Sequence, residues 1–271
     1  MSVYYQDDTV TLHHGDCLHV LPEIADASAG LIVTSPPYFN ARDYVHYGSY
    51  TAYLDRMEAM FIEALRVLRP GRFLAVNSAP VLVPRDSRQE HSMRLGVPYD
   101  LHGRIVGLGF EFVEDIVWRK PDGAGWSTFR GTRFAADRNP LAYKAVPVTE
   151  MVMIYRAPSD RMIDDDIRDQ PADVLAASKV EHYLATNVWD IQPEASKHHP
   201  AVMPLSLAAQ LITCYSFVGD VVLDPFIGSG TTAVAARMLG RRAVGIEYHE
   251  RYLAHAAERV AQGSLFETVA G

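Results

Sequence analysis

The chain has only two cysteines, Cys17 and Cys214, among its 271 residues. They lack the spacing of a metal site, so we expect no metal and a reducing, cytoplasmic location. No apolar run approaches the ~18 residues that would indicate a transmembrane helix. The N-terminal residues 1–8 have neither a basic start nor an apolar middle, which argues against a signal peptide. The sequence therefore predicts no association with a membrane.

The chain also has fewer positively charged residues than negatively charged ones. Lys and Arg number 25 against 33 Asp and Glu, and the net charge is −8. This balance argues against a protein that coats nucleic acid, but a local basic surface could still grip phosphates. With 48% hydrophobic residues, the chain can bury the core of one large α/β domain, with or without a modest insertion.

A short apolar run, residues 31–33, leads directly into Thr34-Ser35-Pro36-Pro37-Tyr38. The pattern predicts a buried strand that stops abruptly, because two consecutive prolines lack N–H donors and keep the backbone extended. A hydroxyl, a free carbonyl and an aromatic ring then lie together at the carboxyl end of a strand, where open α/β sheets bind ligands. Two acceptors beside a stacking ring suit a nucleobase with an amino group. The alternative is a proline-rich turn without a ligand.

A second motif lies near the other end of the chain. Residues 221–223 predict a buried strand, a glycine-rich loop follows over 224–232, and a helix then runs to residue 239. The next strand delivers Glu247, 23 positions after Asp224, a spacing at which a carboxylate reaches ribose hydroxyls. The loop lacks both the three-glycine dinucleotide pattern and the lysine of a P-loop, and it carries an acid. A ligand with an adenosine and a cationic tail fits better than a pyrophosphate.

The remaining chain has the alternation of an α/β domain. Residues 39–50 and 80–95 are interpreted as loops, and residues 157–199 as a polar insertion with an acidic run over 164–166. We expect strands at 10–14, 31–34, 73–77, 112–118, 149–155, 221–223 and 243–246. We expect helices at 18–24, 53–68, 97–108, 205–214 and 233–239. Met57 and Met60 keep helical spacing and are interpreted as core residues.

One segment is basic in this otherwise acidic chain. Residues 119–146 hold six Lys or Arg against two Asp, a local charge of +4, interleaved with glycines and aromatics. A solvated surface loop would explain this composition, but the interleaving favours a loop that contacts nucleic acid. The candidate DNA-binding residues are Arg119, Lys120, Arg130, Arg133, Arg138 and Lys144.

With both motifs present, the chain resembles the S-adenosylmethionine-dependent DNA amino-methyltransferases. Residues 224–232 are similar to that family's cofactor loop and residues 34–38 to its catalytic loop. This order is that of the circularly permuted beta group. Further similarity at 115–120, 187–191 and 199–204 extends the resemblance over most of residues 10–156 and 187–261.

The resemblance implies a Rossmann-like class I methyltransferase fold, a mixed seven-stranded sheet with helices on both faces. It implies a catalytic half at 1–156 with a DNA-contacting loop at 119–146, a small target-recognition insertion at 157–199, and a cofactor-binding half at 200–271. The expected partner is double-stranded DNA. A homodimer is compatible with the resemblance, although the sequence does not decide the oligomeric state, the recognition sequence or the presence of a cognate restriction nuclease.

The resemblance also assigns roles to residues. Asp224 and the loop after it would hold the methionine part of the cofactor, Glu247 the ribose, and Asp16 with Cys17 the adenine. The full expected cofactor set is Asp16, Cys17, Thr34, Pro204, Leu205, Asp224, Pro225, Phe226, Gly228, Ser229, Gly230, Thr231, Thr232, Glu247 and Tyr248. The expected catalytic set is Ser35, Pro36, Pro37 and Tyr38, which would hold a flipped base.

The identity of the base depends on Ser35. The resemblance associates Ser at this position with cytosine-N4 enzymes, and Asp or Asn with most adenine-N6 enzymes. A hydroxyl can also donate to the cytosine ring nitrogen, whereas a carboxylate only accepts. We therefore favour N4 methylation of cytosine in a restriction-modification setting, with adenine-N6 methylation as the alternative. Two further classes of protein fit less well. A catalytically silent partner subunit would not need both loops complete, and an oxidoreductase would need a different glycine pattern.

Overall fold

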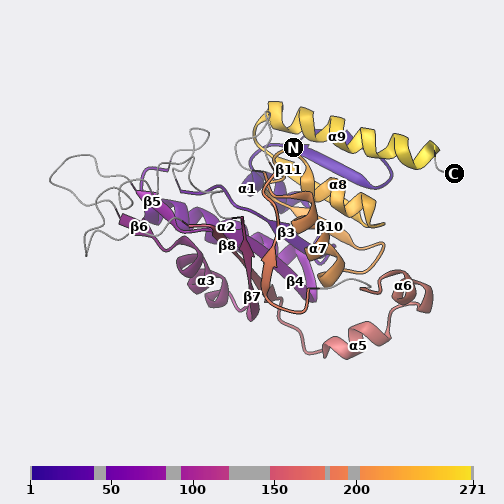
Figure 1. Ribbon diagram of the computed structural model, residues 1–271, viewed down its shortest axis with the longest axis horizontal. Coiled ribbons are helices and arrows are strands. Elements are labelled where there is room, and N and C mark those ends of the chain that lie inside the picture. The colour runs from indigo at the N-terminus through magenta and orange to yellow at the C-terminus, as the bar shows by residue number, and fades with distance from the viewer. Residues whose placement is uncertain are drawn as a thin grey trace.

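A computed structural model describes residues 2–39, 47–83, 93–121, 147–180, 184–194 and 202–269, with side chains to residue 262. One mixed sheet crosses the molecule in the order β1-β2-β11-β10-β3-β4-β8-β7-β9 (Figure 1). Its strands are β1 Ser2–Gln6, β2 Val10–His14, β3 Ala29–Thr34, β4 Leu68–Ser78, β7 Glu111–Arg119, β8 Thr149–Arg156, β9 Val188–Asp190, β10 Val221–Asp224 and β11 Arg242–Glu247. The central strands β2, β11, β10, β3 and β4 are mutually parallel. Their carboxyl ends therefore share one edge of the sheet.

The α/β class and the mixed sheet are confirmed, and all seven predicted strands are present. The predicted number of strands was too low, because β1 and β9 extend the two edges of the sheet to nine. β1 is largely exposed and β9 has only three residues, so neither carries the buried periodicity that identifies a strand in a sequence.

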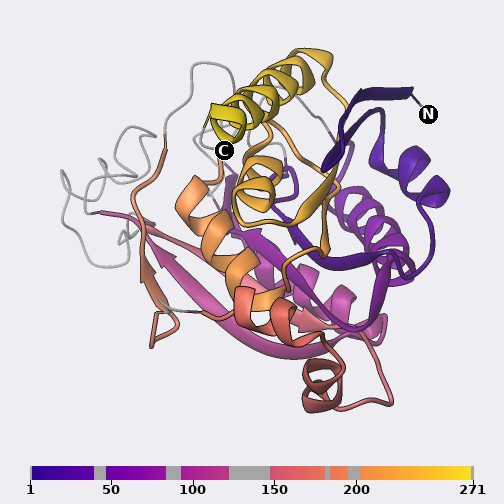
Figure 2. The same cartoon turned by 90° about the vertical axis from the view of Figure 1, so that its right-hand side faces the viewer.

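Helices cover both faces of the sheet (Figures 1 and 2). On one face α1 Cys17–Val20, α2 Tyr50–Val67 and α3 Val97–Gly107 contribute to one core cluster. On the other face α7 Leu205–Tyr215, α8 Thr231–Met238 and α9 Glu250–Val269 contribute to a second cluster. A single turn of 3₁₀ helix, Leu21–Glu23, replaces the end of the helix predicted over 18–24.

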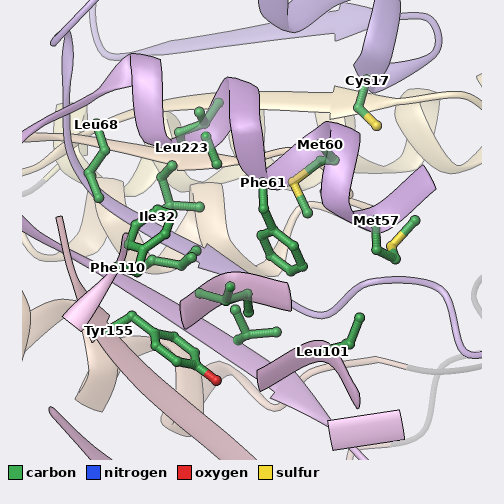
Figure 3. Packing of buried hydrophobic residues seen from close by; sticks show 14 of the residues in the cluster. Cys17, Ile32, Met57, Met60, Phe61, Leu68, Leu101, Phe110, Tyr155 and Leu223 are labelled. Atoms are coloured by element: carbon green, nitrogen blue, oxygen red, sulfur yellow. The ribbon is translucent and has the colours of Figure 1, made fainter. Parts of the chain in front are cut away.

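Helix α2 shows how the pattern of the sequence becomes a core. Ser49 caps its N-terminus by accepting a hydrogen bond from Ala52 N at 3.0 Å. Met57, Met60 and Phe61 lie on the buried face of the helix and belong to the same core cluster as Ile32 of β3 (Figure 3). The prediction that the two methionines fill the core is confirmed.

The prediction of a polar loop over residues 80–95 is wrong at both ends, because each end forms a strand. β5 Val81–Val83 and β6 Met93–Leu95 form an antiparallel pair, and residues 84–92 between them lie outside the described residues. The sequence Val-Leu-Val of β5 has high strand propensity, but a run of three residues is too short to show a period.

Two short helices, α5 Ile163–Arg168 and α6 Ala172–Ala177, follow β8. They stand off the sheet, at the lower right in Figure 1, at the opposite side from the β5–β6 hairpin. Ser178 Oγ accepts a hydrogen bond from Val218 N at 2.8 Å, just before β10 begins. This part of the predicted recognition insertion therefore lies at the amino-terminal edge of the parallel strands, whereas both sequence motifs lie at the carboxyl edge. Among the described helices, none is long and apolar enough to cross a membrane.

Candidate functional site

The two sequence motifs meet at the carboxyl edge of β3 and β10. These strands are neighbours, and Thr34 Oγ1 at the end of β3 donates a hydrogen bond to Asp224 Oδ1 at the end of β10, at 2.9 Å. The two residues are 190 positions apart in the chain. The structure thus places the loop after residue 33 directly beside the glycine-rich loop.

Asp224 is a buried carboxylate that accepts three hydrogen bonds. Besides Thr34, Oδ1 accepts from Phe226 N at 3.0 Å, and Oδ2 accepts from Thr232 Oγ1 at 2.7 Å. Burial raises the pKa of Asp224 to about 6, even though these hydrogen bonds favour the charged form. The nearby Glu247 carboxylate makes a smaller contribution to this rise. A positively charged ligand beside Asp224 would therefore relieve an unfavourable buried charge.

The glycine-rich loop is held against helix α9. Gly230 has φ +84°, and a Cβ at this position would lie 2.8 Å from the Cβ of Ala256. Arg259 Nη1 of the same helix donates to Ser229 O at 2.7 Å and to Thr231 Oγ1 at 3.0 Å. Glycine at position 230 therefore gives both the left-handed backbone and the close approach to α9 that fix the loop.

Glu247 ends β11 and lies beside the glycine-rich loop. Its Oε2 accepts from Gly228 N at 3.0 Å, and its Oε1 accepts from His249 N at 2.8 Å. Burial raises the pKa of Glu247 above its usual value, although the backbone donors oppose the shift. Each oxygen keeps a further lone pair, so the carboxylate can still accept from a pair of ligand hydroxyls.

Asp16 lies next to Glu247, because Gly15 N donates to Glu247 O at 3.0 Å. Asp16 caps α1 through Leu18 N and forms an ion pair with Arg56 of α2 at 2.5 Å. Burial raises the pKa of Asp16, but the Arg56 guanidinium and the Leu18 N–H outweigh it, and the net pKa is lowered. Arg56 was not singled out in the sequence, because an arginine on a helix gives no sign of a partner 40 positions away.

The other residues expected at the cofactor lie around the same edge. Cys17 is buried, and burial raises the pKa of its thiol to about 12. Pro204 precedes α7, and Leu205 N donates to Glu194 Oε1 at 2.8 Å. Tyr248 follows Glu247 and is 66% exposed. Pro225, Gly228, Ser229, Thr231 and Thr232 are buried within the loop or at the start of α8, and Phe226 is half-buried.

The loop after Thr34 is joined to two residues that the sequence pattern did not reveal, Asn77 and Glu150. Tyr38 Oη donates to Glu150 Oε2 at 2.7 Å, and Asn77 Nδ2 donates to the same oxygen at 2.9 Å. Asn77 Nδ2 also lies 3.4 Å from Ser35 Oγ. Asn77 is near the end of the buried strand β4. A polar residue at that position is the feature of the sequence that could have indicated a site residue. Pro36 is buried, and Ser35, Pro37 and Tyr38 are half-buried.

The predicted DNA-binding residues divide into two groups. Arg119 and Lys120 both have acidic partners: Arg119 Nη2 donates to Asp190 Oδ2 at 2.6 Å, and Lys120 forms an ion pair with Glu150. Arg130, Arg133, Arg138 and Lys144 lie outside the described residues. Among the residues that the structure describes, no group of three or more His, Cys, Asp or Glu could hold a metal ion.

The geometry defines a class of site. Two buried carboxylates, Asp224 and Glu247, end neighbouring parallel strands and flank a glycine-rich loop in an open sheet. Within the loop, residues 224–232, there is no Lys or Arg for a phosphate. These groups suit a cofactor with a ribose diol and a positive charge, which S-adenosylmethionine carries.

Comparison with known proteins then gives the family. Residues 29–258 match the model of the N6 and N4 DNA methylases, described as DNA methylase, and the chain belongs to this family. It is 29% identical over 265 residues to the Type II methyltransferase M.ScaI of Streptomyces caespitosus. The alignment covers 95% of this chain and 83% of that protein. It is 28% identical to the Type II methyltransferase M.Cfr9I of Citrobacter freundii, over 92% of this chain and 87% of that protein.

Solved structures agree with the fold. A DNA modification methylase of Thermus thermophilus, TTHA0409, complexed with S-adenosyl-L-methionine, is 32% identical with a TM-score of 0.74, over 93% of this chain and 95% of that one. The cytosine-N4-specific PvuII DNA methyltransferase is 20% identical with a TM-score of 0.72, over 95% of this chain and 88% of that one, and shares the fold. The protein is a DNA methyltransferase, and its cofactor is S-adenosylmethionine.

Proposed function

We propose that this protein methylates the exocyclic N4 amine of a cytosine flipped out of duplex DNA, using the residues at the carboxyl edge of β3 and β10. The observation that carries the proposal is Ser35. Its Oγ lies 3.4 Å from Asn77 Nδ2. Because the Asn77 amide donates to the oxygen, the hydroxyl can turn its proton to the ring nitrogen of a base, and a second lone pair can accept from the amine.

The cofactor would be held by the two carboxylates and by the loop between them. Asp224 would lie near its positive charge, Glu247 would accept from the ribose, and Asp16 with Cys17 would border the adenine. When bound, S-adenosylmethionine supplies an electrophilic methyl group on a sulfonium. Burial raises the pKa of Asp224 to about 6. A positively charged ligand would stabilise this buried carboxylate, which supports the assignment.

We assign to the protein the role of orienting the amine of the base toward the methyl group. An exocyclic amine is a weak nucleophile because its lone pair is delocalised into the ring. Ser35 and the Pro36 carbonyl would accept its two N–H groups and favour a pyramidal nitrogen whose lone pair faces the methyl group. Tyr38 would stack on the base. Preorganised acceptors of this kind act without a covalent intermediate, and no Pro-Cys pair exists for a thiolate attack on the cytosine ring.

We also assign the chain to the circularly permuted beta group. The loop at 34–38 precedes the loop at 224–232 in the chain, yet β10 and β11 lie between β2 and β3 in the sheet. The names of the relatives support a place in a type II restriction-modification system, where the enzyme would act on cellular DNA in the cytoplasm.

Adenine-N6 methylation is the second candidate, because adenine also presents an amine beside a ring acceptor. The presence of Ser at position 35, in place of Asp or Asn, favours cytosine, and the structural neighbour specific for cytosine-N4 is in line with this.

The base is tested directly by its product. DNA from cells that express the protein should contain N4-methylcytosine, and a Ser35→Ala strain provides the matched background. Nucleoside mass spectrometry measures both modified nucleosides in one run. N6-methyladenine alone would overturn the assignment of Ser35 but keep the family. The absence of any methylated base would favour a silent partner subunit.

The basic segment 119–146 is proposed to contact DNA phosphates. Replacing Arg130 and Arg133 together by Gln should weaken DNA binding and lower the slope of log K against log[salt] by about 2, since each phosphate contact contributes a slope of about 0.9. Fluorescence anisotropy at several salt concentrations measures this. Arg242→Gln, an exposed arginine at the start of β11 and outside the predicted DNA-contacting segments, is the control. An unchanged slope would show that the segment is only a solvated surface.

A further inference from the structure

Several hydrogen bonds meet at Glu150, beside the proposed base site. Its carboxylate accepts hydrogen bonds from three segments of the chain: Tyr38 after β3, Asn77 in β4 and Lys120 after β7. The Glu150 side chain is only 12% exposed. A largely buried carboxylate with three donors is well satisfied, and it fixes the relative positions of the groups that donate to it.

The topology explains why this residue reaches the site. β8 is antiparallel to both neighbours, so its beginning lies at the edge where β4 and β7 end. Glu150 pairs with Trp118 across the sheet, and Lys120 lies 4.5 Å from the centre of the Trp118 ring. An acid at the start of an antiparallel strand thus joins the residues that parallel strands deliver at their ends.

The network leaves Asn77 and Tyr38 with little freedom. Asn77 Oδ1 is buried and has no hydrogen-bond partner among the described residues, so the side chain is held through Nδ2 alone. Burial, followed by the charge of Glu150, raises the pKa of Tyr38 well above its usual value, so the Tyr38 hydroxyl remains a donor. Lys120 balances the charge of the carboxylate.

We propose that Glu150 is a positioning residue for the flipped base: it fixes the ring of Tyr38 directly and the hydroxyl of Ser35 through Asn77. This inference rests on the proposed function, because it assigns Ser35 and Tyr38 to the base. It adds that the base site is connected to the basic segment, because Lys120 of that segment forms an ion pair with Glu150.

The test uses a matched pair elsewhere in the same fold. Tyr215 Oη donates to Glu114 Oε1 at 2.5 Å, another tyrosine–glutamate hydrogen bond, on α7 and β7. The variants are Glu150→Gln, Tyr38→Phe and their double, and Glu114→Gln, Tyr215→Phe and their double. Each substitution keeps the shape of the side chain. The measurements are the single-turnover rate of methyl transfer to duplex DNA at saturating cofactor and DNA, the Kd for S-adenosylmethionine by calorimetry, and the Tm.

We expect Glu150→Gln to lower the single-turnover rate ~10- to 100-fold, because small displacements of reacting groups cost factors of this size. Its Kd for the cofactor should remain within about twofold of wild type, a span that corresponds to ~0.4 kcal/mol. The double variant should be no slower than Glu150→Gln alone, since the Tyr38 hydroxyl acts through the Glu150 carboxylate. The control variants should keep the wild-type rate.

The inference is overturned if Glu150→Gln transfers methyl groups as fast as Glu114→Gln, or if the two losses multiply independently. Should Glu150→Gln lower the Tm or the cofactor affinity more than the control does, Tyr38→Phe decides, because it removes a single hydroxyl. A wild-type rate for Tyr38→Phe then overturns the inference. Failure of the proposed function is a separate result, since the wild-type protein itself would transfer no methyl group to cytosine.

Discussion

Replacing Asp224 by asparagine is expected to abolish cofactor binding and, at the same time, to stabilise the free protein at pH 7. Asparagine can preserve the contacts with Thr34, Phe226 and Thr232, because its amide oxygen accepts and its NH₂ can donate to a hydroxyl. It removes only the charge. The loss of a buried charged partner should weaken S-adenosylmethionine binding at least ~10²-fold.

The gain in stability follows from the direction of the pKa shift. Asp224 titrates at about 6 when folded against a reference of 3.8, so the folded protein binds the proton more tightly. The associated stability is complete below the reference pKa and is lost as the pH rises through about 6. At pH 7 the ionised group costs up to ~3 kcal/mol, and Asp224→Asn should recover ~1–3 kcal/mol of it.

Calorimetry with S-adenosylmethionine and urea unfolding at two pH values test both effects. The stabilisation by Asp224→Asn should shrink as the pH is lowered from about 7 to about 5. Asp26→Asn is the matched control, because Asp26 is an exposed carboxylate whose partner is Arg66. Wild-type cofactor affinity in a folded Asp224→Asn variant would show that the cofactor lies elsewhere.

Ser35→Ala is expected to lower the rate of methyl transfer by ~10²–10³, the usual effect of removing one oriented donor or acceptor from a reacting group. Cofactor affinity should remain nearly unchanged, because Ser35 has no contact with Asp224 or Glu247 among the described hydrogen bonds. Single-turnover kinetics and calorimetry separate the two quantities.

The control for this experiment is Ser28→Ala, which removes a serine hydroxyl that donates to Ala25 O at 2.7 Å, at an exposed position. The Ser28→Ala variant should keep the wild-type rate. If Ser35→Ala methylated DNA at a rate within about tenfold of wild type, orientation by the hydroxyl would not be the main contribution of this residue.

Much of this architecture could be predicted because it is local in sequence. The seven predicted strands have apolar runs or alternating sequences, α2 has helical spacing, and both ligand loops follow strands directly. Since the carboxyl ends of neighbouring parallel strands share an edge, the two loops could be expected to lie together. Thr34 and Asp224 meet there.

The sequence did not allow us to predict which residues form hydrogen bonds and ion pairs across large distances in the chain. Arg56 reaches Asp16 from 40 positions away, and Glu150 reaches Tyr38 from 112 positions away. Nothing in the residues around Glu150 distinguishes it from an ordinary strand glutamate. The placement of α5 and α6 was also hidden, because their exposed, polar sequences carry no pattern that selects one edge of the sheet.

The position of β10 and β11 between β2 and β3 has a consequence for synthesis on the ribosome. Strands β2 and β3 emerge early, but the two strands that separate them are made last. At ~5–20 residues per second, β3 waits roughly 10–40 s for its neighbour β10. During that time the edge of β3 is open, which exposes the nascent chain to mispairing and calls for chaperone protection. The same order delays activity, because Thr34 meets Asp224 only near the end of translation.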